Sequence, residues 1–216
     1  MTQSAIPARV EWFRAMEIAT ALVAELRPFC VQIEIAGSLR RHVETVKDIE
    51  LLCVPKLGEV PSLAQSDLFA DKPATVRVDL LMRYLAAETA RGRPWGLRPS
   101  KVGGTSFGEQ NKLLTWQPSA TDWKMPIDVF TATEANWGRD LWVRTGPRAW
   151  NIATAKRAAQ LGLKFHAYGP AAFTAIRGDI PVTCATEADF ARVLRLGIPT
   201  RPEHRTDDTA RLLCNV

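Results

Sequence analysis

The stretch that decides the fold of this chain is Ala36-Gly37-Ser38-Leu39-Arg40-Arg41-His42-Val43-Glu44-Thr45-Val46-Lys47-Asp48-Ile49-Glu50. Before it, apolar residues at 31, 33 and 35 alternate with polar ones, which predicts a strand. After it, residues 48–54 read Asp-Ile-Glu-Leu-Leu-Cys-Val and predict a second, more buried strand. The glycine and serine therefore end one strand, and two carboxylates begin the next.

The two carboxylates of this stretch, Asp48 and Glu50, are spaced so that both side chains point to one face of a strand. The apolar residues Ile49, Leu51 and Cys53 then point into the core on the other face. Carboxylates on an otherwise apolar strand are costly unless they bind cations. An isolated Asp-x-Glu more often marks the exposed start of a strand, so the pair needs support from its surroundings.

That support comes from the residues upstream. Gly37 allows backbone N–H groups to approach a phosphate, and the hydroxyl of Ser38 adds a donor. Arg40 and Arg41 supply guanidinium groups that match phosphate oxygens. Phosphoryl and nucleotidyl transfer need divalent metal ions held by several converging carboxylates. The stretch therefore predicts a centre that binds metal ions and phosphate.

The rest of the chain indicates an α/β (α+β) fold in two parts, residues 1–135 and 136–216. Helical periodicity predicts a helix over 10–27 that ends at Pro28, and another over 76–90. A helix over 151–161 is capped by Gly162, and one over 186–196 has Thr186 as its N-cap. Strands are expected at 112–116 and 126–131 around a polar turn at 118–122, with a β-rich stretch from 163 to about 184. Residues 55–73 and 91–104 are expected to be irregular.

The net charge of +5 lies entirely in the last third of the chain. Residues 136–216 contain 12 Lys and Arg against 7 Asp and Glu, whereas residues 1–135 are balanced. This split fits a basic domain that meets a polyanion, although a solvated basic surface is an equal alternative.

The cysteines, at 30, 53, 184 and 214, are scattered without metal-ligand spacing, so neither zinc nor a disulfide framework is indicated. Reduced thiols, with no visible secretory signal and no run of about 20 apolar residues, favour a cytoplasmic protein without a membrane span. We expect a bacterial cytosol or a virus-infected host cell.

The quoted stretch resembles the active-site signature of the X family of DNA polymerases, the polymerase beta group. That family has Gly-Ser, a pair of arginines and then Asp-x-Asp on the next strand. The resemblance implies that Asp48 and Glu50 bind metal and that Ser38 and Arg41 hold the triphosphate. Glu50 departs from the family's commoner Asp, which lengthens the arm by one methylene.

The third carboxylate has two candidates, Asp79 and Asp128. Asp79 lies between apolar residues but leads into a helical pattern, whereas Asp128 lies on a short β-like run. In the X family the third catalytic Asp precedes a segment that ends in Thr-Gly and leads to a helix headed by Asn. Thr145-Gly146 and Asn151 match this pattern, so we choose Asp128. The family's mechanism implies that Asp128 also accepts the proton of the attacking 3′-hydroxyl.

The resemblance continues to the end of the chain, through Leu196-Gly197-Ile198-Pro199 and Pro202-Glu203-His204-Arg205. It implies a nucleotidyltransferase palm with a mixed β-sheet and flanking helices, followed by a small α+β thumb-like domain. Gly37, Ser38, Arg40, Arg41, Thr145, Gly146 and Asn151 would then bind the nucleotide. Val143 and Arg144 stand where the family carries an aromatic pair. Further contacts with DNA or nucleotide are expected from Arg144, Arg148, Lys156 and Arg157.

The implied function is template-directed DNA polymerisation in gap filling or repair, with two Mg²⁺ ions that Mn²⁺ could replace. The expected partners are nucleoside triphosphates and gapped or primer-template DNA, and we expect a monomer that resembles the minimal viral form of the family. One alternative is a nucleotidyltransferase that adds nucleotides without a template to a nucleic-acid end or a small acceptor. Another is a nucleic-acid-binding module without catalytic activity.

Overall fold

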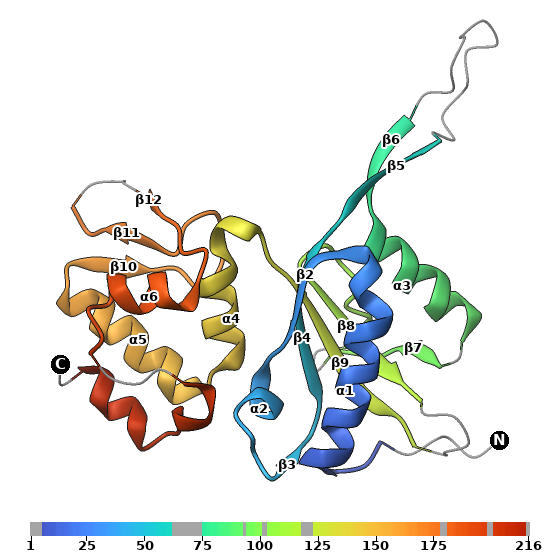
Figure 1. Ribbon diagram of the computed structural model, residues 1–216, viewed down its shortest axis with the longest axis horizontal. Coiled ribbons are helices and arrows are strands. Elements are labelled where there is room, and N and C mark those ends of the chain that lie inside the picture. Colours follow the sequence, from blue (N-terminus) through green and yellow to red (C-terminus); the bar gives the residue numbers. More distant parts are fainter. Residues whose placement is uncertain are drawn as a thin grey trace, which may run out of the picture.

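The computed structural model describes residues 6–61, 75–92, 94–100, 103–117, 123–177, 181–197 and 201–214. Its centre is a five-stranded mixed sheet in which the parallel pair β4 and β9 is flanked by antiparallel neighbours (Figure 1). In spatial order the strands are β2 (Cys30–Ile35), β4 (Ile49–Pro55), β9 (Met125–Thr131), β8 (Asn111–Trp116) and β7 (Trp95–Leu97). The chain therefore has the mixed α/β architecture that the sequence predicts.

One face of this sheet is covered by α1 (Trp12–Leu26) and α3 (Leu80–Arg91). Side chains at helical spacing bury one side of α1, and the turn η1 (Arg27–Phe29), which contains Pro28, ends the helix. The predicted inward set Ile49, Leu51 and Cys53 packs in this core and is fully buried. The sheet face that these three residues occupy is thus apolar, as predicted.

The opposite face of the sheet carries the alternate residues of β4 and β9. Leu52 and Phe130 pack there against Trp137 and Leu141 of α4 (Trp137–Thr145). A short turn, η2 (Glu134–Asn136), leads from β9 into α4. The elements that follow α4 in the sequence lie on this side of the sheet, and α4 lies between them and the strands in Figure 1.

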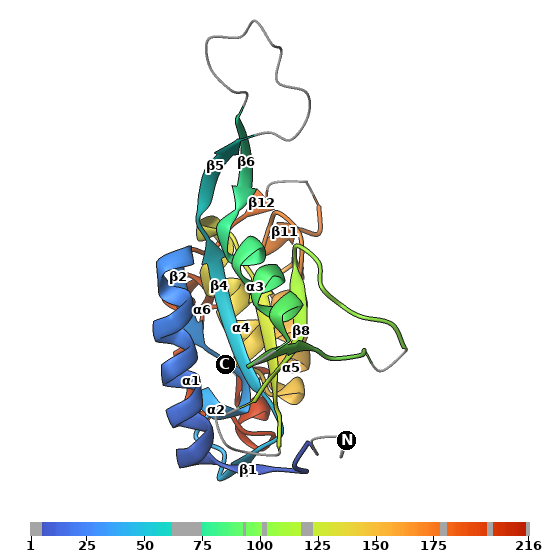
Figure 2. The ribbon, with the colours of Figure 1, turned by 90° about the vertical axis from the view of Figure 1, so that its right-hand side faces the viewer.

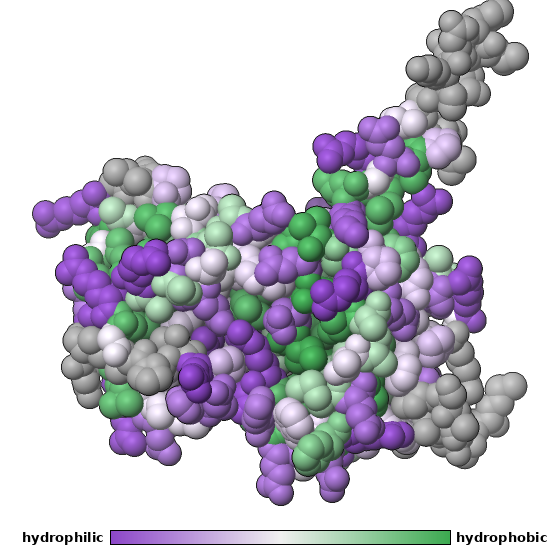
Figure 3. Space-filling view, viewed as in Figure 1, coloured by the Kyte–Doolittle hydropathy of each residue, from purple (hydrophilic) through white to green (hydrophobic). Residues whose placement is uncertain are grey.

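We call residues 6–133 the N-terminal part and residues 134–214 the C-terminal part. Beyond α4 the latter contains α5 (Arg148–Gln160), β10 (Leu163–Phe165), β11 (Phe173–Ala175), β12 (Pro181–Val182), α6 (Glu187–Val193), η3 (Pro202–His204) and η4 (Thr209–Cys214). It has its own apolar core, built around Trp142, Trp150, Phe173 and Phe190. Hydrophilic side chains cover much of its surface on the left of Figure 3. The predicted boundary after residue 135 falls inside η2, and the division into two domains stays a prediction.

The remaining elements are short. β1 (Val10–Glu11) pairs with β3 (Thr45–Val46), and α2 (Gly37–Arg40) follows β2. β5 (Leu57–Pro61) and β6 (Thr75–Asp79) form an antiparallel ribbon that projects from the body of the molecule (Figures 1 and 2).

Several predicted elements need correction. The helix expected from residue 76 begins only at Leu80, because residues 75–79 pair with β5 and the side chain of Asp79 caps the helix at the nitrogen of Met82. Residues 57–61 and 95–97, expected to be irregular, are strands, and α5 begins at Arg148 rather than at 151. The helix α6 is capped by Thr186 as predicted. The turn at 118–122 lies outside the described residues.

Two further findings concern the cysteines and the length of the helices. All four cysteines are free thiols in the structure. None of the described helices is both long and apolar enough to cross a membrane.

Candidate active site

The site is built on the sheet face that meets the C-terminal part. Glu50 of β4 and Asp128 of β9 are register partners on adjacent parallel strands, so their side chains leave the same face next to each other. Asp48 stands just before β4, two residues from Glu50. The structure therefore brings together the three carboxylates that the sequence singled out.

The pKa values of these carboxyl groups reflect their proximity. Burial, together with the negative charges of Asp48 and Asp128, raises the pKa of Glu50 to about 8, against the opposite effect of Arg144 and Arg41. Burial also raises the pKa of Asp128, and the charge of Arg98 opposes this shift. Like charges gathered in a poorly solvated place favour either a proton or a cation.

The other candidate, Asp79, lies elsewhere. It caps α3, accepting a hydrogen bond of 2.8 Å from the backbone nitrogen of Met82. Its charge acts on the buried Lys112, which is the register partner of Val129 and so lies on the opposite face of the sheet from Asp128. Asp79 is therefore separated from the carboxylate group by the sheet itself.

Arg98, which follows β7, forms an ion pair with Asp128. From the sequence alone, Arg91, Arg93, Arg98 and Lys101 belong either to a loop that touches a DNA backbone or, equally, to a solvated loop. In the structure the guanidinium of Arg98 turns inward, and its Nε is buried without a hydrogen-bond partner among the described residues. Arg93 and Lys101 lie outside the described residues.

Gly37 forms the wall of the site beside Glu50. Its φ of +64° lies in the left-handed region, and a Cβ there would stand 2.6 Å from Oε2 of Glu50. Both observations require glycine at this position. Ser38 is half-buried on α2, the short helix that Gly37 begins.

The paired arginines connect the two parts of the chain. Arg40 donates to Thr145 Oγ1 at 2.8 Å and forms a two-pronged ion pair with Glu187 at 3.1 and 2.8 Å. Glu187 also pairs with the buried Arg205 at 2.8 Å. Arg41 donates to the backbone carbonyl of Thr145. Arg40, expected to bind nucleotide, is thus engaged by Glu187 and Thr145 in this structure.

Arg144 lies between the carboxylates and the C-terminal part. Its guanidinium carbon is 3.5 Å from the centre of the Phe130 ring and 5.5 Å from that of Tyr168. Its charge lowers the pKa values of both Glu50 and Asp128. Arg144, which stands where the X family carries an aromatic residue, therefore partly offsets the negative charge of these two carboxylates.

The other expected contacts divide into three groups. Gly146 lies beside Arg41, whose Nη1 would be 3.5 Å from a Cβ at that position. Asn151 donates a hydrogen bond of 2.8 Å to the carbonyl of Val143, and its Oδ1 is buried without a hydrogen-bond partner in the described part of the chain. Arg148 and Lys156 are exposed on α5.

Arg157 does not face outward, as the expected contact with DNA or nucleotide would require. Its side chain is buried, and its Nε donates 3.0 Å to the carbonyl of Leu194, so it ties α5 to the end of α6. Its place in the helix explains this role, because Ala153, Thr154 and Ala158 around it also face the core of the C-terminal part.

Two residues of the site escaped sequence reasoning in their present roles. Sequence reasoning places Glu187 only within the helix expected over 186–196 and Arg205 only in the tail. Glu187 pairs with Arg40, 147 positions away, and with Arg205, 18 positions away, so no local pattern reveals these contacts. The sequence signal that could have revealed the contact is the opposite charge of the arginine pair at 40–41 and of the acidic first turn of α6.

Asp48, Glu50 and Asp128 are the candidate ligands for metal ions at this site. As the described side chains stand, no three His, Cys, Asp or Glu side chains are close enough to hold an ion together. Asp128 is paired with Arg98, and the side chain of Glu50 lies against Gly37, where a Cβ atom would otherwise stand. The three groups are nonetheless all carboxylates, which is the donor type that Mg²⁺ and Mn²⁺ prefer, and the absent Cβ of Gly37 leaves Glu50 room to turn. The residues fit divalent ions once their side chains reorient.

Comparison with profiles of known protein families and with curated proteins finds no match for this chain.

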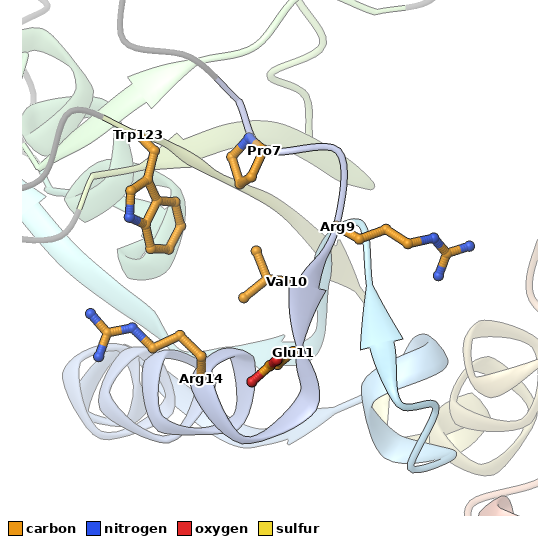
Figure 4. A pocket seen from close by; sticks show the side chains of 6 residues that line it. All are labelled: Pro7, Arg9, Val10, Glu11, Arg14 and Trp123. Carbon is orange, nitrogen blue, oxygen red and sulfur yellow. The ribbon is translucent and has the colours of Figure 1, made fainter.

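A separate hollow of about 440 Å³ lies at the start of the chain, between β1, the first turn of α1 and Trp123 (Figure 4). Arg9 points away from Trp123 there and donates 2.8 Å to the carbonyl of Thr45. Its lining residues include none of the carboxylates or arginines described above, so the candidate site is distinct from it.

Proposed function

We propose that this chain is a metal-dependent nucleotidyltransferase that joins a nucleoside monophosphate from a nucleoside triphosphate to a 3′-hydroxyl, as a small DNA polymerase similar to the X family. The N-terminal part serves as its palm, and the C-terminal part serves as the thumb-like domain. The preferred acceptor is a primer end in gapped DNA.

The observation that carries the proposal is the register of Glu50 with Asp128, with Asp48 two residues away. Glu50 and Asp128 lie on one sheet face, and burial and neighbouring carboxylates raise the pKa values of both groups. Such a group is expensive to maintain in a protein that does not bind cations there. A nucleic-acid-binding module would gain affinity for phosphate by losing them.

In this proposal Asp48, Glu50 and Asp128 hold two Mg²⁺ ions, which when bound neutralise charge on the transferring phosphate. Asp128 would also accept the proton of the attacking hydroxyl, after Arg98 has released it. Gly37 and Ser38 offer backbone and hydroxyl donors to the triphosphate, and Arg41 offers a guanidinium group.

In this proposal the C-terminal part holds the paired arginines of the site in position. Thr145 and Glu187 hold Arg40, and Thr145 also holds Arg41, so the phosphate-binding turn and α4 form one connected unit. Positioning of this kind brings reacting groups together without further loss of entropy during the reaction. Arg148 and Lys156 on the exposed side of α5 are suited to a nucleic-acid backbone.

The test is primer extension on DNA with a single-nucleotide gap, with Mg²⁺ or Mn²⁺ and each dNTP and rNTP supplied singly. We expect addition of the nucleotide that pairs with the template base, and loss of addition in Asp48→Asn. Addition that ignores the template base would instead support untemplated transfer. No addition to gapped, single-stranded or RNA acceptors with either metal would contradict the proposal.

A further inference from the structure

A second cavity of about 770 Å³ lies along α4, between the end of the sheet and the loop that follows β10. Its lining includes Gln110, Asn111, Asn136, Asp140, Arg144 and Tyr168. We call it the hinge cleft, because α4 and η2 join the two parts of the chain there. The cleft reaches the carboxylate site through Arg144, which lines it and also acts on Glu50.

One wall of the hinge cleft is fixed in place by buried hydrogen bonds. Arg139 is only 4% exposed and donates to the carbonyls of Gly169 and Ala171 at 2.8 and 2.9 Å. Asn136, only 3% exposed, donates 2.8 Å through Nδ2 to the carbonyl of Pro170. The loop that carries Tyr168 is therefore formed before any ligand arrives, which lowers the cost of binding.

This wall leaves a specific acceptor without a partner. Because Nδ2 of Asn136 is committed to Pro170, the orientation of the amide is set, and Oδ1 is a buried acceptor with no hydrogen-bond partner among the described residues. A buried unsatisfied acceptor costs free energy that an N–H group of a ligand would recover on reaching it. A ligand with a hydrogen-bond donor on the Asn136 side of the cleft is therefore favoured, once neighbouring atoms move aside to uncover Oδ1.

The loop held by Asn136 also carries a flat aromatic ring, and a cation lies beside that ring. Tyr168 exposes 63% of its surface although it belongs to this fixed loop. The guanidinium of Arg144 lies between the rings of Phe130 and Tyr168. An exposed ring suits stacking by a planar heteroaromatic group, and Arg144 suits a phosphate attached to it.

We propose that the hinge cleft binds a nucleotide whose base carries an exocyclic amino group, with the base towards Asn136 and Tyr168 and the phosphate towards Arg144. The choice of a nucleotide among planar N–H donors rests on the proposed function, but binding in the cleft requires no catalysis. The nucleotide can be free or can be an unpaired residue of a nucleic-acid strand. Its place next to Arg144 lets its occupancy change the charge beside Glu50.

The test uses 2-aminopurine, whose fluorescence falls when its ring stacks, with EDTA present to exclude metal. The probes are 2-aminopurine riboside 5′-monophosphate and a single-stranded oligonucleotide with one 2-aminopurine. We expect quenching with at least one probe, and a Kd about 5- to 100-fold weaker in Tyr168→Ala, which loses the stacking ring. Tyr168→Phe keeps the ring and should bind within about twofold of the unchanged protein, as should Ile176→Ala, a matched exposed residue.

Competition then examines the buried acceptor. AMP should displace the probe at least about fivefold better than purine riboside 5′-monophosphate, which lacks the amino group. Quenching of the free nucleotide assigns the cleft to nucleotides, and quenching of the oligonucleotide alone assigns it to unpaired bases. Equal Kd values for Tyr168→Ala and the unchanged protein, or equal competition by the two purines, would overturn the proposal. Asp48→Asn should bind like the unchanged protein, so a failure of catalysis leaves this result readable.

Discussion

Glu50 and Asp128 face the same side of the sheet from partnered positions on the parallel strands β4 and β9. Burial raises the pKa values of both carboxyl groups, and the negative charge of Asp128 raises that of Glu50 as well. The arrangement is unfavourable for the protein alone and favourable for a protein that binds cations, which is a common conflict between stability and function.

The first prediction follows from the pKa of Glu50, which is raised from 4.5 to about 8. A raised pKa in the folded state means that this group favours folding most below pH 4.5 and that this contribution is lost as the pH rises through 8. Glu50→Gln should therefore be more stable than the unchanged protein at pH 9 in EDTA, by on the order of 1–3 kcal/mol, with a smaller difference at pH 5. Urea unfolding at both pH values measures this.

The exposed Glu44→Gln serves as the control for loss of a carboxylate as such. A Glu50→Gln variant that is less stable than the unchanged protein at pH 9 without metal would show that Glu50 is satisfied by other groups. Added Mg²⁺ should raise the stability of the unchanged protein more than that of Glu50→Gln, because ligand binding to the folded state stabilises it.

The second prediction separates Asp128 from Asp79. Asp128→Asn should lower the rate of primer extension by about 100-fold or more, because it removes both a metal ligand and the proposed proton acceptor. Asp79→Asn should keep activity and stability, since asparagine caps a helix about as well as aspartate. Single-turnover extension of a gapped primer compares them directly. The assignment would be reversed by an active Asp128→Asn beside an inactive Asp79→Asn.

These residues also show how far sequence reasoning reaches. The apolar runs predicted the two strands, and the resemblance to the X family led to the choice of Asp128, but the pairing of β4 with β9 and its register come only from the structure. The ribbon of β5 and β6 was missed because Val76 fits helical spacing with Leu80 and Tyr84 and also fits strand alternation with Val78. Only the pairing with β5, about 20 positions away, distinguishes the two. Short apolar runs are ambiguous in this way.

The connections between the two parts of the chain were beyond sequence reasoning for a different reason. Arg40 was read as a phosphate ligand from its neighbours, whereas its partner Glu187 lies 147 residues later. Arg98 was read as an exposed loop residue, but the antiparallel pairing of β7 with β8 directs the chain back towards Asp128. Contacts of this kind depend on packing between elements, which no local pattern encodes.

The third prediction concerns Gly37. Gly37→Ala adds a Cβ at 2.6 Å from Glu50 Oε2 and places alanine at a φ of +64°. We expect a stability loss of about 1–2 kcal/mol from the backbone and a loss of activity of at least about tenfold from the displaced carboxylate. Gly92→Ala is the matched control, because Gly92 has a φ of +87° but open space around its Cβ position. Comparable loss of activity in both variants would mean that backbone strain alone explains the effect.

The fourth prediction concerns the ion pair of Arg40 with Glu187, which joins α2 to α6 where both side chains are less than one-fifth exposed. A double-mutant cycle of Arg40→Gln and Glu187→Gln, followed by urea unfolding, should give a coupling energy of about 1–3 kcal/mol. The pair Arg211 and Asp208, whose side chains are 76% and 91% exposed, should give less than about 1 kcal/mol. Glu187→Gln should also raise the KM for dNTP, because Arg40 would lose the carboxylate that holds it beside Thr145. A coupling energy as small as that of the exposed pair would mean that the two parts of the chain are held together by the apolar contacts of α4 alone.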